Sequence, residues 1–301
     1  MNLASNIGES SSRLLPNSAP PRSASEVKNL LKKYSIRPSR GLGQNFLIDK
    51  AAIRKIITAA DLKPEDLVLE IGPGLGVLTQ ELAKKVKKVV AVEKDPKMVT
   101  VLEETLKDYK NVEIIQGDIL KFQISGFKFQ INPKYQITNY KIVASLPFYL
   151  AAPVIRKSLE FKNPPESMTL IIQKEVARRI AARPPKMNLL AASVQFYAEP
   201  KIISYISRKS FWPQPKVDAA IIKIILRINN YTPDELLSKE FFRIVKAGFS
   251  QPRKLLINNL SKKLKVDKIK VEAWLWKSNI QPSQRAEALN IENWISLAEA
   301  F

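Results

Sequence analysis

The chain has 301 residues, 45% of them apolar, a length that suits one large domain and one smaller domain. It has no cysteine and no histidine, which excludes disulfides, Cys/His zinc sites, thiol nucleophiles and a histidine base, and no apolar run reaches the roughly 18 residues that span a membrane. The formal net charge of +21, from 49 basic and 28 acidic residues, favours nucleic acid as a partner over a merely solvated basic surface.

The first 24 residues are rich in Ser, Asn and Pro and follow no helical or strand period. This composition is typical of a disordered tail, and it lacks the apolar stretch of a secretory signal. An organelle presequence is the alternative, because Arg13 and Arg22 outnumber Glu9. We predict a disordered tail over residues 1–24.

A short helix from Lys28 to Tyr34 follows, and Ser25 is placed to act as its N-cap. The next stretch, Arg40–Asp49, carries two glycines and two side-chain amides, which predicts a structured loop. Asp49 can cap a helix over Ala51–Ala60, where the isoleucines keep helical spacing.

A strand, a glycine turn, a helix and a second strand follow in order. Leu67–Ile71 is a short apolar run typical of a buried strand, and Val89–Val92 is a second one, closed by Glu93. Three glycines stand at every second position between them, at Gly72, Gly74 and Gly76. Glycines let the backbone approach a ligand closely, and an acid at the tip of the second strand suits a ribose diol. The G-x-G-x-G spacing resembles the S-adenosylmethionine (SAM) site of class I methyltransferases; a bare structural turn is the alternative.

Two further strand ends carry candidate ligand groups. Asn111–Ile115 is predicted to be a strand that leads to Asp118, whose carboxylate can accept a hydrogen bond from an adenine amine or simply cap a turn. Residues 121–140 have no clear period, and we assign no function to them. Lys141 opens another strand, which runs into Ser-Leu-Pro-Phe at 145–148, where the aromatic ring offers a stacking face for an extruded base.

Six motifs in order resemble the ribosomal RNA adenine dimethyltransferase family, enzymes that dimethylate two adjacent adenosines near the 3′ end of small-subunit rRNA. The motifs are GQNFL at 43–47, EIGPGLG at 70–76, GDIL at 117–120, QKEVAR at 173–178, FWPQPKVD at 211–218 and RAEAL at 285–289. The resemblance covers about residues 28–300. It implies SAM as the cofactor, with contacts from Asn45, Leu47, Gly72, Gly74, Glu93, Asp118 and Ser145.

The family motif Asn-Leu-Pro-Tyr or Asn-Leu-Pro-Phe stands here as Ser145, Leu146, Pro147 and Phe148, which the resemblance implies are the catalytic residues. In the family, the asparagine oxygen and the next carbonyl accept hydrogen bonds from the target amine, and the aromatic ring stacks on the adenine. A serine hydroxyl reaches less far than an amide. The family's Gly-Ser loop and Tyr-Gly are also missing here, where residues 183–190 read RPPKMNLL.

Helical spacing dominates from residue 229 onward, over Pro233–Lys246, Arg253–Leu264, Val266–Trp276 and Ile291–Phe301. Between residues 231 and 270, ten basic residues face four acidic ones, which favours phosphate contact over a merely solvated face. The family's basic segments correspond here to Arg178, Arg253 and Lys254, which we predict to bind RNA.

The sequence thus predicts an α/β protein with a Rossmann-like class I SAM-dependent methyltransferase domain over 25–228 and an all-helical RNA-binding domain over 229–301. We predict a cytoplasmic, monomeric rRNA adenine N6-methyltransferase that acts on small-subunit rRNA or on the pre-ribosomal small subunit, with no metal and no membrane contact. An RNA-binding ribosome-assembly factor with weak or no methyltransferase activity is the alternative, because Ser145 replaces the motif asparagine. A small-molecule methyltransferase fits the positive charge poorly, and RAEAL favours the small-subunit enzyme over a related large-subunit one.

Overall fold

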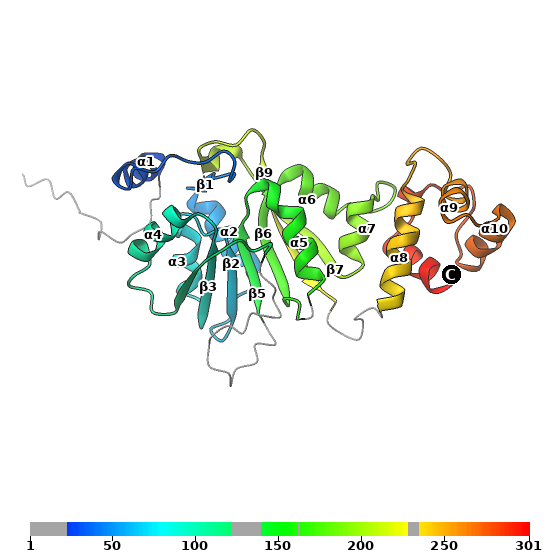
Figure 1. The fold of residues 1–301 in the computed structure, drawn as a ribbon, viewed down its shortest axis with the longest axis horizontal. Helices are drawn as coiled ribbons and strands as arrows, with labels where there is room; N and C mark the ends of the chain where they lie inside the picture. The colour runs from blue at the N-terminus through cyan, green and yellow to red at the C-terminus, as the bar shows by residue number, and fades with distance from the viewer. Residues whose placement is uncertain (1–22, 122–139, 162, 228–234) are drawn as a thin grey trace, which may run out of the picture.

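The computed structural model describes residues 23–121, 140–161, 163–227 and 235–301 (Figure 1). The predicted disordered tail, apart from its last two residues, lies outside the described residues. The interior of the 121–140 stretch lies outside them as well.

A seven-stranded sheet forms the centre of the larger part of the molecule. Its strands are β2 (Leu67–Ile71), β3 (Lys88–Glu93), β4 (Val112–Gln116), β5 (Lys141–Ser145), β6 (Ser167–Gln173), β7 (Ala198–Ile206) and β9 (Ala219–Leu226). They lie in the order β4-β3-β2-β5-β6-β9-β7. The first five pair in parallel, and β9 runs antiparallel to both of its neighbours. The carboxyl ends of the five parallel strands therefore meet at one edge.

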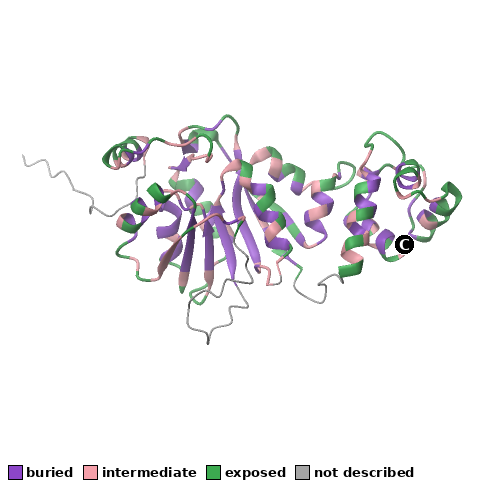
Figure 2. Cartoon of the chain, in the orientation of Figure 1, coloured by how far each residue is buried: buried purple, intermediate pink, exposed green. Residues whose placement is uncertain are grey.

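Helices cover both faces of the sheet, because successive strand residues point to opposite sides and both sides are apolar. One face packs against α1 (Ala24–Lys33), α2 (Lys50–Ala60), α3 (Val77–Ala83) and α4 (Pro96–Thr105). The other packs against α5 (Ala151–Leu159), α6 (Lys174–Ile180) and α7 (Leu189–Gln195). Figure 2 shows the central strands buried. This three-layer arrangement confirms the predicted Rossmann-like fold.

The N-cap predicted at Ser25 is wrong, because the helix begins earlier in the chain. Ser23 has extended backbone angles, and its hydroxyl accepts a hydrogen bond from the Glu26 backbone N–H, so Ser23 is the N-cap of α1. The Ser25 hydroxyl instead lies 3.0 Å from that of Ser23. Ser23 and Ser25 have the same side chain and lie two positions apart, so residue type alone could not decide which of them is the N-cap.

A small two-stranded ribbon ties the Arg40–Asp49 loop to a distant part of the chain. Its strands are β1 (Phe46–Leu47) and β8 (Phe211–Trp212), which pair antiparallel. A short helical turn, η3 (Arg208–Ser210), comes directly before β8, and another, η2 (Phe148–Leu150), follows β5. The GQNFL and FWPQPKVD motifs are thus joined directly in the fold.

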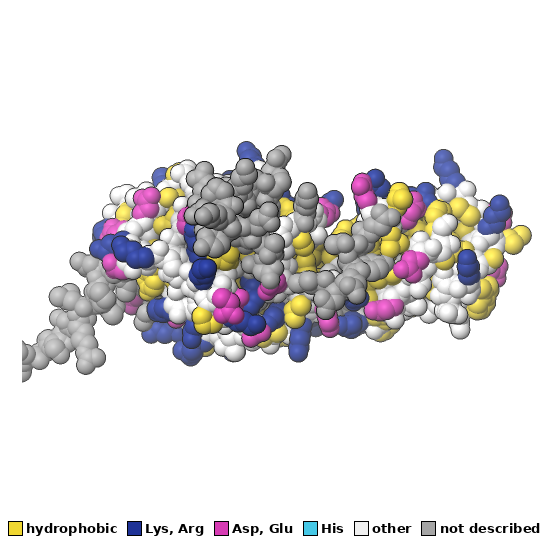
Figure 3. Space-filling model, turned by 90° about the horizontal axis from the view of Figure 1, so that it is seen from below, with side chains coloured by type: hydrophobic (Ala, Val, Ile, Leu, Met, Phe, Trp, Pro, Cys, Tyr) yellow, Lys and Arg dark blue, Asp and Glu magenta, His cyan; other side chains and the backbone are white. Residues whose placement is uncertain are grey.

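The C-terminal part is all-helical, as predicted, and its core also includes residues of α7. It consists of α8 (Glu235–Gly248), α9 (Leu256–Leu264), α10 (Lys268–Lys277), the short turn η4 (Ala286–Ala288) and α11 (Ile291–Glu299). Phe241 stacks on Phe196, the residue that ends α7, with ring centroids 3.9 Å apart. Gly248 leaves room for Trp294, because a Cβ there would lie 2.4 Å from the indole ring. Lys and Arg side chains stand along the face seen in Figure 3.

Candidate active site

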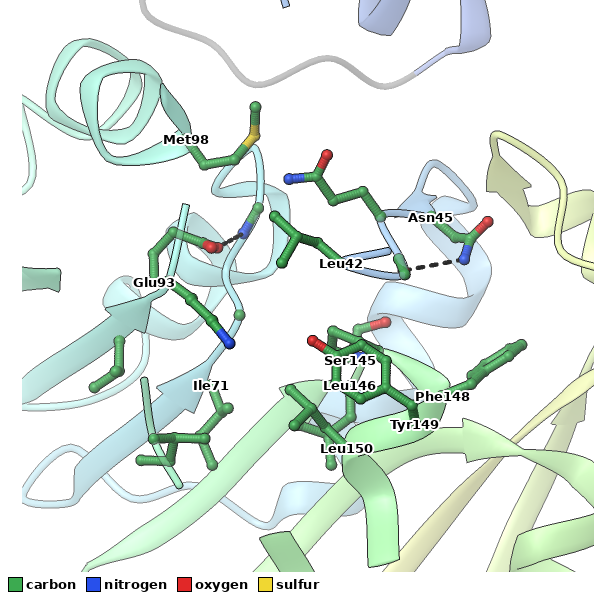
Figure 4. A pocket seen from close by; sticks show the side chains of 18 of the residues that line it. Leu42, Asn45, Ile71, Glu93, Met98, Ser145, Leu146, Phe148, Tyr149 and Leu150 are labelled. Atoms are coloured by element: carbon green, nitrogen blue, oxygen red, sulfur yellow. Dashed lines mark hydrogen bonds between the residues drawn. The ribbon is translucent and has the colours of Figure 1, made fainter. Parts of the chain in front are cut away.

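A pocket opens at the carboxyl edge of the parallel strands, where six segments of the chain converge (Figure 4). They are the loop that leads into β1, the glycine turn after β2, the segments that follow β3, β4 and β5, and the start of β8. The lining residues are Leu42, Gly43, Gln44, Asn45, Phe46, Ile71, Gly72, Gly74, Val92, Glu93, Lys94, Met98, Gly117, Asp118, Ile119, Ser145, Leu146, Pro147, Phe148, Tyr149, Leu150 and Phe211. The carboxyl edge of an open α/β sheet is where such folds bind ligands.

The glycine turn forms the wall between β2 and α3. Gly72, Gly74 and Gly76 all have φ between 60° and 77°, a left-handed conformation that side chains rarely adopt. At Gly74 a Cβ would also lie 3.2 Å from the ring of Phe46. The glycine at this position is therefore needed both for the backbone angle and for the close approach of the Arg40–Asp49 loop.

Glu93, at the end of β3, is the most buried acid of the pocket, with 7% of its surface exposed. Its Oε2 accepts a hydrogen bond from the Gly74 backbone N–H at 3.3 Å, and its Oε1 accepts one from the Asp95 N–H at 2.9 Å. Burial raises the pKa of this carboxyl, while the two backbone donors act in the opposite direction. Each oxygen keeps further acceptor capacity, so Glu93 can bind a diol.

Asp118, after β4, is paired across the pocket edge with Lys94. The Lys94 ammonium lies 2.9 Å from Asp118 Oδ2, and Oδ1 accepts a hydrogen bond from the Leu120 backbone N–H at 3.0 Å. The hydrogen bond from Lys94 lowers the pKa of Asp118. Asp118 is therefore an ionised acceptor at neutral pH, the state that suits an amine donor.

Gln44 fixes the loop that borders the opposite side of the pocket. Its amide N–H donates to Asp95 Oδ2 at 2.8 Å, and its amide oxygen accepts from the Ser39 backbone N–H at 2.7 Å. Asp95 also caps α4 and donates its own N–H to Glu93. The loop, the α4 cap and the buried Glu93 therefore form one hydrogen-bonded unit. Asn45 points its amide back to the Gly43 carbonyl, at 3.1 Å.

The Ser145–Phe148 segment leaves the sheet at the end of β5. The Leu146 N–H donates to the Ile171 carbonyl of β6 at 3.1 Å, and Pro147 has φ −51°. Among the described residues no backbone N–H donates to the Leu146 carbonyl, and the Ser145 hydroxyl makes no hydrogen bond to the pocket residues drawn in Figure 4. Both oxygens can therefore accept a hydrogen bond from a ligand. The Phe148 side chain points away from Ser145 in this view and packs on the core, whereas Tyr149 is 50% exposed.

A second buried acid, Glu70, lies under the glycine turn and outside the pocket lining. Burial raises its pKa to about 8, and within the described part of the chain its Oε2 has no hydrogen-bond partner. At neutral pH Glu70 is therefore mostly protonated.

The structure brings most of the residues predicted for the site into the one pocket. Those that line it are Asn45, Gly72, Gly74, Glu93, Asp118, Ser145, Leu146, Pro147 and Phe148. Leu47 does not line it; its side chain is buried in the core and its backbone pairs with β8. Arg178, Arg253 and Lys254 are exposed outside the pocket. Gln44, Lys94 and Tyr149 line the pocket and were not singled out in the sequence; only Gln44 carried a signal, as one of the two loop amides.

The chemistry of the pocket fits SAM better than a dinucleotide. Its charged side chains are two carboxylates, Glu93 and Asp118, and one lysine, which is already paired with Asp118. Such a set would repel a pyrophosphate but suits a ligand that carries a sulfonium and an ammonium group. Apolar residues such as Ile71, Ile119 and Leu146 supply the walls that an adenine ring needs. The fold and the pocket together are those of a class I SAM-dependent methyltransferase.

Comparison with known proteins identifies one family within this class. The family described as "Ribosomal RNA adenine dimethylase" matches residues 37–301. A "Ribosomal RNA small subunit methyltransferase A" of Dehalococcoides mccartyi is 41% identical over 281 residues, 93% of this chain and 94% of that protein. The protein of the same name from Geobacillus kaustophilus is 39% identical, over 91% and 94% of the two chains. The chain belongs to the ribosomal RNA adenine dimethylase family.

Solved structures agree with this assignment. The 23S rRNA methyltransferase ErmE has a TM-score of 0.69 and 26% identity, over 85% of this chain and 99% of that one. A dimethyladenosine transferase from Plasmodium falciparum has a TM-score of 0.68 and 25% identity, over 84% and 95% of the two chains. In the described ranges, no helix is long and apolar enough to cross a membrane. The same ranges hold no cluster of three or more Asp or Glu side chains that could bind a metal ion.

Proposed function

We propose that this chain transfers methyl groups from SAM to the N6 amine of adenosines in small-subunit rRNA, at two adjacent positions near its 3′ end. The observation that supports the proposal is that Glu93, Gly72 and Gly74 of the glycine turn, and the Ser145–Phe148 segment line one pocket. The net charge of +21 supports an RNA substrate.

The cofactor residues would act in two ways: some would accept hydrogen bonds from SAM, and others would leave room for it. Glu93 would hold the ribose hydroxyls, and Asp118 would accept the adenine amine, while Gly72 and Gly74 leave the backbone close to the ligand. Asn45 would border the cofactor from the loop, and the backbone of Leu47 would fix that loop through its pairing with β8. When bound, SAM supplies a methyl group on a positively charged sulfur.

The substrate residues hold the amine rather than deprotonate it. The Ser145 hydroxyl and the Leu146 carbonyl would each accept one N–H of the target amine, which leaves the nitrogen lone pair directed into the pocket. The fixed backbone at Pro147 holds both acceptors in place. Phe148 would stack on the extruded base. No group in this scheme has to remove a proton before the transfer, which suits a chain without histidine.

The proposal also covers the RNA-binding residues, the two domains, the oligomeric state and the location of the protein. Arg178, Arg253 and Lys254 would contact phosphates, with residues 25–228 forming the methyltransferase domain and residues 229–301 the RNA-binding domain. We expect a cytoplasmic monomer whose substrate is the unmodified or pre-ribosomal small subunit.

Ser145 favours one further candidate, an RNA-binding assembly factor with weak or no methyl transfer. The deciding experiment incubates the protein with labelled SAM and unmodified small subunits and identifies the labelled nucleosides. We expect N6-methylated adenosines, and less of this product from the Glu93→Ala variant when SAM is limiting. Labelled nucleosides other than adenosine would contradict the proposed target. Binding of small subunits without any labelled product would favour the assembly factor.

A further inference from the structure

The outward face of α10 carries two large apolar side chains, Ile269 and Trp276, which nothing in the described chain covers, with Glu272 beside them. Val271 and Leu275 are fully buried and hold the helix on the C-terminal core. On the outer side, Ile269 is 78% exposed and Trp276 is 56% exposed. These two residues are seven positions apart, so they lie on one face two helical turns from each other. A helix that is apolar on two sides usually has a second partner.

This face stands in a strongly basic surround. Between residues 262 and 277, six lysines accompany only two acids, Asp267 and Glu272. Asp267 is engaged as the N-cap of α10, where it accepts the Ile269 backbone N–H at 2.8 Å. The lysines are Lys262, Lys263, Lys265, Lys268, Lys270 and Lys277, and all are exposed.

These lysines are not used in the ion pairs of the helical part. Within the residues that the structure describes, its ion pairs join Lys239 to Glu235, Arg243 to Glu240 and Arg285 to Glu287, and Arg227 reaches Glu292. Figure 3 shows dark blue and yellow side chains together at the right-hand end, where α9 and α10 lie in Figure 1. The six lysines are therefore free to neutralise an anionic partner.

We infer that the outer face of α10 is an anchoring site for single-stranded or looped-out ribosomal RNA, in which Trp276 stacks on an unpaired base and the surrounding lysines contact the flanking phosphates. The inference rests on the proposed function, which supplies RNA as the substrate class. Aromatic rings amid basic side chains are the common means of binding unpaired nucleotides. A protein partner is disfavoured because protein interfaces are depleted in lysine.

The α10 site lies far from the active-site pocket, and this separation restricts which RNA substrates could reach both. In Figure 1, α10 is at the opposite end of the molecule from α4, and the pocket lies at the carboxyl edge of the sheet between them. A short oligonucleotide in the pocket could not reach α10. The substrate must therefore be a folded rRNA or a small subunit that presents a second, unpaired segment at this distance.

The test measures equilibrium binding of the full chain to protein-free, unmodified small-subunit rRNA as a function of salt. Trp276→Ala should weaken binding about 5- to 150-fold, the loss of one stacked base, and Trp276→Phe should retain most of it. Lys268→Gln with Lys270→Gln should flatten the slope of log affinity against log salt by about 0.7 for each lysine. The matched control is Lys85→Gln with Lys107→Gln, two exposed lysines beside α3 and α4, which should leave the α10 contribution intact.

Three outcomes would overturn the inference. Trp276→Ala could bind the rRNA as well as the unmutated chain does. It could weaken binding only to intact subunits and not to protein-free rRNA, which would identify a ribosomal protein as the partner. The control pair could lower binding as much as the α10 pair, which would indicate only a general charge effect. Unchanged far-UV circular dichroism and an unchanged thermal unfolding transition of the full chain show that each variant, including its helical part, is folded. Failure of the unmutated chain to methylate rRNA would remove the proposed function, yet it would leave the effect of Trp276→Ala on RNA binding measurable.

Discussion

Replacing Ser145 by asparagine tests the amine-holding turn without disturbing its backbone. Ser145 is the last residue of β5, and the next N–H is held by the Ile171 carbonyl at 3.1 Å. An asparagine side-chain oxygen ends about one C=O bond, roughly 1.2 Å, beyond the position of the serine oxygen. A misplacement of about 1 Å in a reacting group can cost about a hundredfold in rate, or about 2.7 kcal/mol in the activation free energy. Ser145→Asn should therefore raise the rate of methyl transfer by up to about a hundredfold.

The assay is a single-turnover transfer from labelled SAM to unmodified small subunits, with SAM and RNA affinities measured separately. Both affinities should stay nearly unchanged, because the substitution alters the group proposed to accept the target amine and leaves the other cofactor and RNA residues in place. Loss of a robust unmutated activity in Ser145→Asn would refute this reasoning, since the pocket would then have been built around the hydroxyl. Phe148→Ala should lower the rate by removing stacking worth roughly 1–3 kcal/mol. A larger loss in Tyr149→Ala would assign the stacking to that half-exposed ring instead.

Three further predictions concern the cofactor wall, the RNA surface and the buried acid. Glu93→Ala should weaken SAM binding by roughly 1–3 kcal/mol in calorimetry, and an unmutated chain that binds no SAM would contradict the enzyme assignment. Arg253→Ala with Lys254→Ala should flatten the salt dependence of RNA affinity by up to about two in slope, and an unchanged slope would place the phosphate contacts elsewhere. Because the pKa of Glu70 is raised from 4.5 to about 8, the folded state binds a proton that the unfolded chain has lost, so stability falls as pH rises through this window. Glu70→Gln should reduce that fall in thermal melts between pH 5 and 8.5, and an identical pH profile would show that Glu70 is already ionised.

The sequence predicts those parts of the site that strand geometry controls. Glu93 and Asp118 follow apolar runs, and the carboxyl ends of parallel strands meet at one edge, so their convergence could be expected. The Lys94–Asp118 ion pair could not be expected from the sequence, because it depends on the rotamers of two side chains on neighbouring strand ends. The Gln44–Asp95 hydrogen bond joins residues 51 positions apart, and local patterns carry no information on such a contact.

The same distinction applies to the fold. Continuous apolar runs predicted β2, β3 and β5, whereas β1 and β8 have two residues each and no period to detect. The sequence also gave no prediction for β7, an edge strand of alternating burial that contains Pro200. Proline is tolerated there because an edge strand needs fewer ladder hydrogen bonds. Elements defined by tertiary pairing, rather than by their own residues, are the ones that sequence patterns miss.

The pairing of β1 with β8 has a consequence for synthesis of the chain. Phe46 and Phe211 both line the pocket, although 164 residues separate them, and β9 must enter the sheet between β6 and β7. The glycine turn and Glu93 emerge from the ribosome early, but the wall that closes over them waits for the last third of the chain. A nascent chain that stops before residue 211 therefore has the cofactor's acceptors without the enclosure that would hold it. We therefore expect cofactor binding only after β8 has been made.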